Sequence, residues 1–348
     1  MTTQADRSLS VASPYANWGA SYRVRVQKWI ERTDVQHRLV ADGRPESDHR
    51  SRKLHAGDLR YEIGARVRRQ SGDRILIQKE ASRLGTGSLE RSLRKRFTNV
   101  IFDIDDAVYL PSRTSILGSR HGRVDTILGI ADRVIAGNEH LADYCSEFVR
   151  DVVLIPSCVE PGDYMTRSEA SEPRRLTVGW LGSGSTAHYV DTALPALAAV
   201  QKDLGIRVVM IGASGPDVIQ RHGCKIERYP WSRSAEASML AGLDVGIVPL
   251  QNTPWEQGKC AYKLLQYGAA GIAPVGSPVG VVGSILESIG APAVVGTKDW
   301  EAALRHLLNA EGERRALGEK LRSHVVANYS YASWQTAWLT AIGSGSQA

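Results

Sequence analysis

Two groups of charged residues in this sequence have the types and spacing that binding or activating an anionic substrate requires. Asp105 and Asp106 follow the apolar run Asn99–Ile104, which has the composition of a buried parallel strand. Open α/β sheets bind ligands at the carboxyl ends of their strands, so both carboxylates are candidates for substrate contact. Lys259 and Lys263 are four residues apart, and on one helix they would share a face. The carboxylates suit catalysis, and the lysines suit phosphate binding.

The segment of residues 244–280 supplies the elements that would position the lysines. Its pattern predicts a buried strand, a loop, a helix and a second strand, at Leu243–Pro249, Leu250–Gly258, Lys259–Ala270 and Ile272–Val275. A lysine in the first turn of a helix opposes the helix dipole, and a second lysine one turn on adds repulsion. A diphosphate bound by both lysines and the free N–H groups would offset that cost, and a solvated lysine face is the alternative. Gln266, on the same face, would then reach a ribose hydroxyl.

The run DVGIVPL…PWEQGKCAYKLLQYGAAGIAPVGSPVG resembles the donor-binding region of family 4 retaining glycosyltransferases, which have the GT-B fold. One branch of that family has the same GKC-x-x-KLLQY-x-AAG pattern and the same DIDDA run. In the wider family, two glutamates eight residues apart contact the donor sugar and the ribose. Here the second position is Gln266 and the first is Gly258, beside Glu256 and Gln257, which are the candidates for the missing role.

The resemblance implies an α/β protein of two doubly wound, Rossmann-like domains that face a cleft. It implies an acceptor-side domain at 1–165, a donor-binding domain at 171–328, and a helix at 329–348 that crosses back to the first domain. The implied activity is transfer of a sugar from a nucleotide-diphospho-sugar, with UDP expected, to an acceptor hydroxyl with retention of anomeric configuration. The acceptor would be a small molecule, a glycan or a lipid-linked compound. No metal and no cofactor is expected, because the sugar nucleotide is a substrate.

Further donor-site candidates come from two strand–turn segments of the second domain. After the strand Leu176–Leu181, glycines would let the backbone approach a phosphate, although many glycine-rich turns bind nothing. The resemblance implies that the strand end around Tyr229 and Trp231 contacts the nucleotide base, and core aromatic residues are the equal alternative. The full set of donor-binding candidates is Gly182, Ser183, Gly184, Ser185, Tyr229, Trp231, Glu256, Gly258, Lys259, Lys263 and Gln266.

The resemblance places Asp105 and Asp106 near the reacting carbon, as the catalytic candidates. Departure and attack on the same face of the sugar is what it implies, so a conventional nucleophile is not required. Weaker acceptor-side candidates are Ser21, Arg23 and His121, for which a solvent-facing side chain is the alternative.

Two alternatives remain at this stage. The run VIFDIDDAVY also resembles the first motif of haloacid-dehalogenase-type phosphatases, in which a strand ends in DxD and an aspartate is the nucleophile. That chemistry needs a lysine and a downstream acidic pair for magnesium, and no GDxxxD-like partner is found. The missing first glutamate favours the other alternative, a protein that binds nucleotide-sugars without transferring them.

Composition restricts the remaining classes. The chain has 348 residues, of which 43% are hydrophobic, enough for two domains with separate cores. The formal net charge is +6, and many arginines lie between Arg60 and Arg96. Aromatic residues do not alternate with them, so nucleic-acid binding is not expected, whereas peripheral contact with an anionic membrane is allowed. The oligomeric state is left open. No 18-residue apolar run, secretory signal or metal-binding cysteine spacing is present, so the expected location is the cytoplasm.

Overall fold

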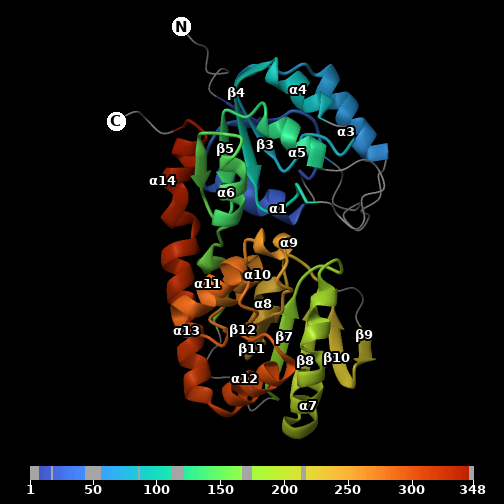
Figure 1. Cartoon of the computed structure of the whole chain (residues 1–348), viewed down its shortest axis with the longest axis vertical. Helices are drawn as coiled ribbons and strands as arrows, with labels where there is room; N and C mark the ends of the chain where they lie inside the picture. Colours follow the sequence, from blue (N-terminus) through green and yellow to red (C-terminus); the bar gives the residue numbers. More distant parts are fainter. Residues whose placement is uncertain are drawn as a thin grey trace. The chain divides into compact units, whose positions relative to one another are not determined.

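The computed structural model describes residues 8–16, 19–43, 56–84, 87–110, 121–166, 175–212 and 217–344 (Figure 1). The chain forms two compact units. The first comprises Met1–Ser157, Gly258–Cys260 and Trp334–Ala348, and the second comprises Cys158–Gln257 and Ala261–Ser333. A short piece of the predicted lysine helix therefore belongs to the first unit.

The described strands of the first unit form a parallel sheet in the order β2-β1-β3-β4-β5-β6. Their bounds are β1 (Leu9–Ala12), β2 (His37–Leu39), β3 (Gly72–Gln78), β4 (Phe97–Ile104), β5 (Arg133–Ala136) and β6 (Val152–Leu154). Strand β1 has β2 on one side and β3 on the other, so the winding direction reverses there. In sheets of this kind the switch point is where ligands bind. The carboxyl ends of β1, β3 and β4 therefore lie side by side at a predicted ligand site.

Helices pack on this sheet through their apolar faces. Those described are α1 (Ala20–Tyr22), η2 (Arg23–Gln27), α2 (Lys28–Thr33), α3 (Ala56–Val67), α4 (Ser88–Arg94), α5 (His121–Leu128), α6 (Glu139–Ser146) and, from Trp334 on, α14 (Tyr331–Ala341). The buried rings of Trp29 and Trp338 stack with centroids 5.4 Å apart and planes 8° from parallel. Arg133 donates to the carbonyls of Thr340 and Ala341 at 3.0 Å. The stacked tryptophan rings and the hydrogen bonds from Arg133 thus hold α14 on the sheet of this unit.

The second sheet has the order β12-β11-β7-β8-β10-β9, and all pairs are parallel except β10 with β9. Its strands are β7 (Thr177–Leu181), β8 (Arg207–Ile211), β9 (Asp217–Arg221), β10 (Cys224–Tyr229), β11 (Val245–Val248) and β12 (Ala273–Gly276). Strand β9 was not predicted. It forms a tight hairpin with β10, in which His222 and Gly223 both have positive φ, 50° and 78°. The winding reverses between β7 and β11, so the switch point of this sheet lies at the end of β7.

The described helices of the second unit surround this sheet. They are η4 (Pro161–Asp163), η5 (Ala187–Thr192), α7 (Leu194–Leu204), α8 (Glu236–Ala241), α9 (Pro254–Gln257), α10 (Tyr262–Ala269), α11 (Gly280–Ile289), α12 (Thr297–Asn309) and α13 (Glu311–Tyr329). Trp180, Tyr267 and Trp300 are fully buried in its core. The hydroxyl of Tyr267 accepts from the Leu181 N–H at 3.0 Å, which ties α10 to the end of β7. Among the helices in the described ranges, none is both long and apolar enough to span a bilayer.

The predicted start of the lysine helix is wrong. Helix α10 begins at Tyr262, not at Lys259, because Ala261 adopts a left-handed conformation with φ 52°. Lys259 therefore does not share a helical face with Lys263. The Gly-Ser loop after β7 leads into the 3-10 helix η5, and the α-helix α7 starts at Leu194.

Candidate functional site

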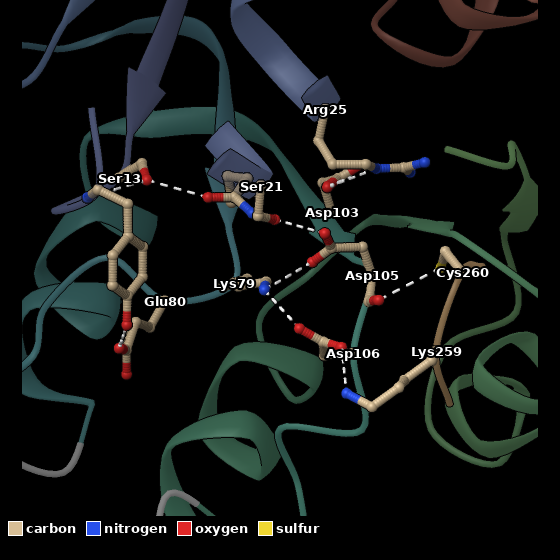
Figure 2. A network of polar contacts seen from close by, with 12 residues as sticks. Ser13, Ser21, Arg25, Lys79, Glu80, Asp103, Asp105, Asp106, Lys259 and Cys260 are labelled. Carbon is tan, nitrogen blue, oxygen red and sulfur yellow. Dashed lines mark hydrogen bonds and ion pairs between the residues drawn. The ribbon is translucent and has the colours of Figure 1, made fainter. Parts of the chain in front are cut away.

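The carboxylate pair of the first unit contacts a lysine that was not predicted. Lys79 lies directly after β3, and its Nζ is 3.0 Å from Asp105 Oδ1 and 2.7 Å from Asp106 Oδ2 (Figure 2). The side chains of Lys79, Asp105 and Asp106 are 16%, 11% and 30% exposed, so water screens these charges only in part. Strands β3 and β4 are neighbours in the sheet, which brings the residues after each into contact.

The backbone of Lys79 has a conformation that few residues with a side chain adopt. Its φ is +63°, in the left-handed region, which costs roughly 1–3 kcal/mol for a residue other than glycine. Its N–H donates to the Asp103 carbonyl at 2.9 Å, which fixes the turn. Burial disfavours the charged ammonium, but Asp105 and Asp106 outweigh burial and raise the pKa of Lys79. The lysine therefore stays protonated and holds two negative charges next to each other.

A chain of hydrogen bonds orients Asp105 from the other side. Ser13 Oγ donates to Gln78 Oε1 at 3.1 Å, and Gln78 Nε2 donates to Ser21 Oγ at 2.8 Å. Ser21 in turn donates to Asp105 Oδ2 (Figure 2). The structure thus brings the acceptor-side candidate Ser21 together with a catalytic candidate. The members of this chain come from the ends of β1 and β3, from α1, and from the end of β4.

Beneath this network, Asp103 forms a buried ion pair with Arg25. Both side chains are 1% exposed, and Arg25 Nη2 is 2.7 Å from Asp103 Oδ2. Arg25 Nη1 also donates to the Ile155 carbonyl at 2.7 Å. Burial would lower the pKa of Arg25, but Asp103 outweighs burial and raises it, so the guanidinium is charged. In the phosphatase alternative Asp103 would be the nucleophile, and its burial against a guanidinium excludes that role.

A second buried pair lies beside Lys79. Glu80 accepts from Arg123 Nη1 at 2.7 Å and from the hydroxyl of Tyr15. Because Lys79 has a left-handed backbone conformation, its side chain and that of Glu80 contact different partners. Lys79 pairs with Asp106, and Glu80 pairs with Arg123. The loop after β3 is therefore anchored by charge on both sides.

The residues Gly258–Cys260 pack on the end of β4. Lys259 Nζ lies 3.8 Å from Asp106 Oδ1, and Cys260 Sγ donates to the Asp105 carbonyl at 3.2 Å. A Cβ on Gly258 would lie 2.7 Å from the Cβ of Ala107 and 2.9 Å from its N atom, so no side chain fits there. This close approach is the reason that position 258 has no glutamate. Burial raises the pKa of Cys260, which keeps this residue a thiol.

In the second unit, Lys263 lies against the glycine loop at the end of β7. A Cβ on Gly182 would be 2.6 Å from Lys263 Cε and 2.5 Å from the Trp180 ring. Lys263 Nζ is 5.4 Å from the centroid of that ring, within cation–π range. Lys263 is half-buried and follows the start of α10 by one residue. The Lys263 ammonium and the backbone of Gly182, which has no side chain, therefore lie together at the switch point of this sheet. This arrangement suits phosphate binding.

The ends of the next two strands adjoin this point. Gly212, after β8, has φ +90°, and a Cβ there would be 2.4 Å from the Gly182 carbonyl and 3.2 Å from Trp231 Cβ. Trp231 therefore lies near the glycine loop. The Tyr229 carbonyl also adjoins it, because it accepts from the Gly212 N–H at 2.8 Å. The Tyr229 side chain points away, since its hydroxyl donates to Glu227 at 3.0 Å and accepts from Arg207 at 3.2 Å, and Arg207 begins β8. The structure thus separates the side chains of the two base-pocket candidates.

The predicted serine donors form a turn of their own. The hydroxyls of Ser183 and Ser185 are 2.7 Å apart, and the Ser183 carbonyl accepts from the N–H of Thr186 at 2.9 Å and from its hydroxyl at 3.1 Å. Ser183 and Gly184 are exposed. The loop is compact and open to a ligand.

Gln266 and Glu256 are both buried in side-chain networks. Gln266 is 4% exposed, and its Nε2 donates to Glu236 Oε1 at 2.8 Å and to Tyr164 Oη at 3.2 Å. Glu256 accepts from the hydroxyls of Tyr189 and Thr253. The Glu236 carboxylate that accepts from Gln266 also accepts from Tyr164 Oη at 3.1 Å and from Trp231 Nε1.

The sequence-predicted residues thus fall into two groups. Ser21, Asp105, Asp106 and Lys259 come together in the first unit, and Gly182, Lys263 and Trp231 come together in the second. Arg23 lies in η2, and the side chain of His121 is outside the described part of the chain. Sequence reasoning missed Lys79, Gln78 and Glu236. Gln78 ends β3 and Lys79 follows it, so the apolar run of residues 75–77 just before them was a usable signal, whereas nothing local marks Glu236. Within the described residues, no group of three or more His, Cys, Asp or Glu could hold a metal ion.

No family model and no curated protein matches this chain. Solved structures do match, several of them over 96% or 97% of this chain. Sucrose-phosphate synthase from Thermosynechococcus elongatus is 14% identical with a TM-score of 0.72, covering 96% of this chain and 98% of its own. WaaG, a glycosyltransferase involved in lipopolysaccharide biosynthesis, is 13% identical with a TM-score of 0.68, covering 97% and 100%.

A third similar structure is Anabaena Alr3699/HepE in complex with UDP-glucose. It is 11% identical with a TM-score of 0.67, and the match covers 97% of this chain and 100% of HepE. At these identities the likeness defines the fold. The chain has the GT-B glycosyltransferase fold of two Rossmann-like domains, which confirms the predicted fold class.

Proposed function

We propose that this protein transfers a glycosyl unit from a nucleotide-diphospho-sugar to an acceptor hydroxyl, with retention of anomeric configuration. One observation carries the proposal: Lys263 lies over Gly182 at the switch point of a sheet in a GT-B fold. Backbone N–H groups and an ammonium together suit a diphosphate. The complex of HepE with UDP-glucose supports UDP as the nucleotide. The acceptor would be a small molecule, a glycan or a lipid-linked compound.

In this proposal the second unit stabilises the leaving group. As the bond from the sugar to the diphosphate breaks, negative charge builds on the β-phosphate. Lys263 and the N–H groups of the loop after β7 are in place before that charge develops, so no reorganisation is needed. Trp180, under the lysine, holds its side chain toward the loop.

The first unit would serve the sugar and the acceptor. Asp105 and Asp106 carry negative charge that can stabilise an oxocarbenium-like transition state. Lys79 keeps the two carboxylates together, and Ser21 fixes the orientation of Asp105. Attack and departure occur on the same face, and the acceptor proton passes to the departing phosphate oxygen.

We propose that no metal or resident cofactor takes part. The DxD-like run resembles a metal site, but the Lys79 ammonium lies between the carboxylates, where a bridging cation would bind. A chelator should therefore leave transfer unchanged. Loss of transfer on chelation, restored by added magnesium, would contradict this point.

The experiment uses the full chain with UDP- and GDP-sugars and a panel of acceptor alcohols, and it follows release of nucleoside diphosphate. Release that depends on the acceptor, and a product of unchanged anomeric configuration by NMR, would support the proposal. Lys263→Met should reduce release, whereas Lys225→Met, an exposed lysine on β10, is the matched control. Release of nucleoside diphosphate that does not depend on the acceptor would instead indicate hydrolysis of the nucleotide-sugar.

A binding protein without transfer activity is the second candidate. Gly258 favours it, because its contact with Ala107 leaves no room for a carboxylate at the position that contacts the sugar in the resembled family. In that case the full chain would bind nucleotide-sugars by calorimetry and release no nucleoside diphosphate with any acceptor. Asp105→Asn would then leave every measured quantity unchanged.

A further inference from the structure

Helix α3 of the first unit exposes a stripe of large apolar side chains, Leu59, Ile63 and Val67. They are 54%, 52% and 71% exposed. They follow one another at intervals of four residues, so they lie along one side of the helix. Single exposed apolar residues are common, but a contiguous set rimmed by polar residues marks an interaction site.

Arginines border this α3 stripe on both sides. At about 100° per residue, Arg66 has nearly the same angular position around the helix as Leu59, and Arg60 nearly that of Val67. One arginine therefore lies on each side of the stripe. Both arginines are exposed, and Arg69 is exposed just beyond the helix. Burial together with the charges of Arg66 and Arg69 lowers the pKa of Arg96.

The acidic residues of α3 are buried in ion pairs, one of them with the bordering Arg66. Asp58 is buried and pairs with Arg83 at 3.1 Å, and Glu62 is buried and pairs with Arg66 at 2.6 Å. Arg68, which follows the helix, pairs with Asp42. Within the described residues of α3, the exposed face therefore carries apolar and basic side chains and no acid.

We propose that the α3 stripe docks this chain on the surface of an anionic lipid bilayer. The apolar side chains would enter the boundary between headgroups and acyl chains, and the bordering arginines would meet lipid phosphates. A nucleic acid would use the arginines and leave the stripe in water. A second copy of the chain would place arginines against arginines. Charge complementarity thus selects a negatively charged membrane.

Vesicle sedimentation of the full chain tests the proposal. The chain should bind vesicles of phosphatidylcholine with phosphatidylglycerol, bind vesicles of phosphatidylcholine alone far more weakly, and lose binding as salt rises. The double variant Ile63→Ser, Val67→Ser should bind at least about tenfold more weakly. Arg60→Gln should cost about fivefold. No sugar nucleotide is present, so the result is independent of glycosyl transfer.

Matched controls lie outside α3. Val295, which is 73% exposed, and Arg315, which is exposed on α13, give the variants Val295→Ser and Arg315→Gln, and neither should change vesicle binding. Equal binding of wild type and stripe variants would overturn the proposal. A lower melting temperature of the double variant in buffer would also overturn it, because the chain itself would then cover the stripe. A dimer in buffer that the double variant abolishes would assign the stripe to a second copy.

Discussion

At the strand ends of the first unit, the carboxylates of Asp105 and Asp106 are already paired with Lys79, whereas in the second unit Lys263 lies over an aromatic ring beside a bare glycine loop. The first arrangement is held in place by ion pairs before any substrate arrives. The second offers positive charge and open backbone to an incoming anion. Substitutions in the first should therefore act on stability and rate, and those in the second on affinity.

The largest effect is expected from the buried pair under the first site. Arg25→Met leaves Asp103 buried without its counter-charge and should lower the free energy of unfolding by roughly 3–5 kcal/mol. Chemical denaturation followed by tryptophan fluorescence measures this loss. The double variant Arg25→Met, Asp103→Leu should regain a large part of it, because both charges are then removed. If the single variant is as stable as wild type, the pair does not support this unit.

The next effect concerns the two lysines. Lys263→Ala should weaken binding of a nucleoside diphosphate by about 10- to 150-fold, through loss of a charge-assisted bond. Lys259→Ala should weaken it far less, because Lys259 faces Asp106 in the first unit. Calorimetric titration of both variants with UDP and with uridine separates the cases. Equal losses for UDP and uridine would show that Lys263 does not contact the diphosphate.

Substitution of the two carboxylates should lower the catalytic rate and leave UDP affinity almost unchanged. Asp105→Asn and Asp106→Asn should each lower kcat at least about tenfold while UDP affinity stays within about twofold. Steady-state kinetics and calorimetry on the same preparations provide both numbers. An unchanged kcat in both variants would remove the carboxylates from the mechanism, and a parallel loss of UDP affinity would make them part of the donor site.

The strand ends could be predicted because they depend on local pattern. The apolar run before Asp105 is buried strand β4, and the carboxylates lie at its carboxyl end, as expected. The start of α10 could not be predicted in the same way. Alanine is the best helix former, yet Ala261 breaks the helix with φ 52°.

The cause of that break is tertiary. Cys260, just before Ala261, is buried against Gly137, where a Cβ would lie 2.5 Å from its Sγ. The chain must leave this contact before it can enter α10, and residues more than 100 positions apart determine the turn. The left-handed backbone conformation of Lys79 also has a tertiary cause, because contacts with the end of β4 stabilise it. Sequence pattern therefore located both strand-end sites but not the turns that aim their side chains.

The smallest expected effect tests how the loop that carries Lys79 is supported. Glu90 is fully buried and accepts from the N–H groups of Ala81 and Ser82 at 3.1 and 3.3 Å. Burial raises the pKa of its carboxyl group above the ordinary value of 4.5. The folded chain therefore holds this proton more tightly than the unfolded chain does. Its stability is greatest below the unfolded pKa and falls as pH rises through the folded pKa.

Glu90→Gln removes the ionisable carboxyl group and keeps a side-chain oxygen that can accept from the N–H groups of Ala81 and Ser82. At pH 7 the melting temperature of the variant should be a few degrees above that of wild type, because a gain of about 1 kcal/mol in the free energy of unfolding has this effect. The difference should shrink to nothing as the pH falls below about 4.5, because the wild-type carboxyl group is then protonated in both states. Thermal melts across this pH range measure both limits, with transfer kinetics at pH 7 as the control. A variant that is less stable than wild type at pH 7 and equally stable below about pH 4.5 would mean that the Glu90 charge supports the loop that carries Lys79, contrary to this prediction.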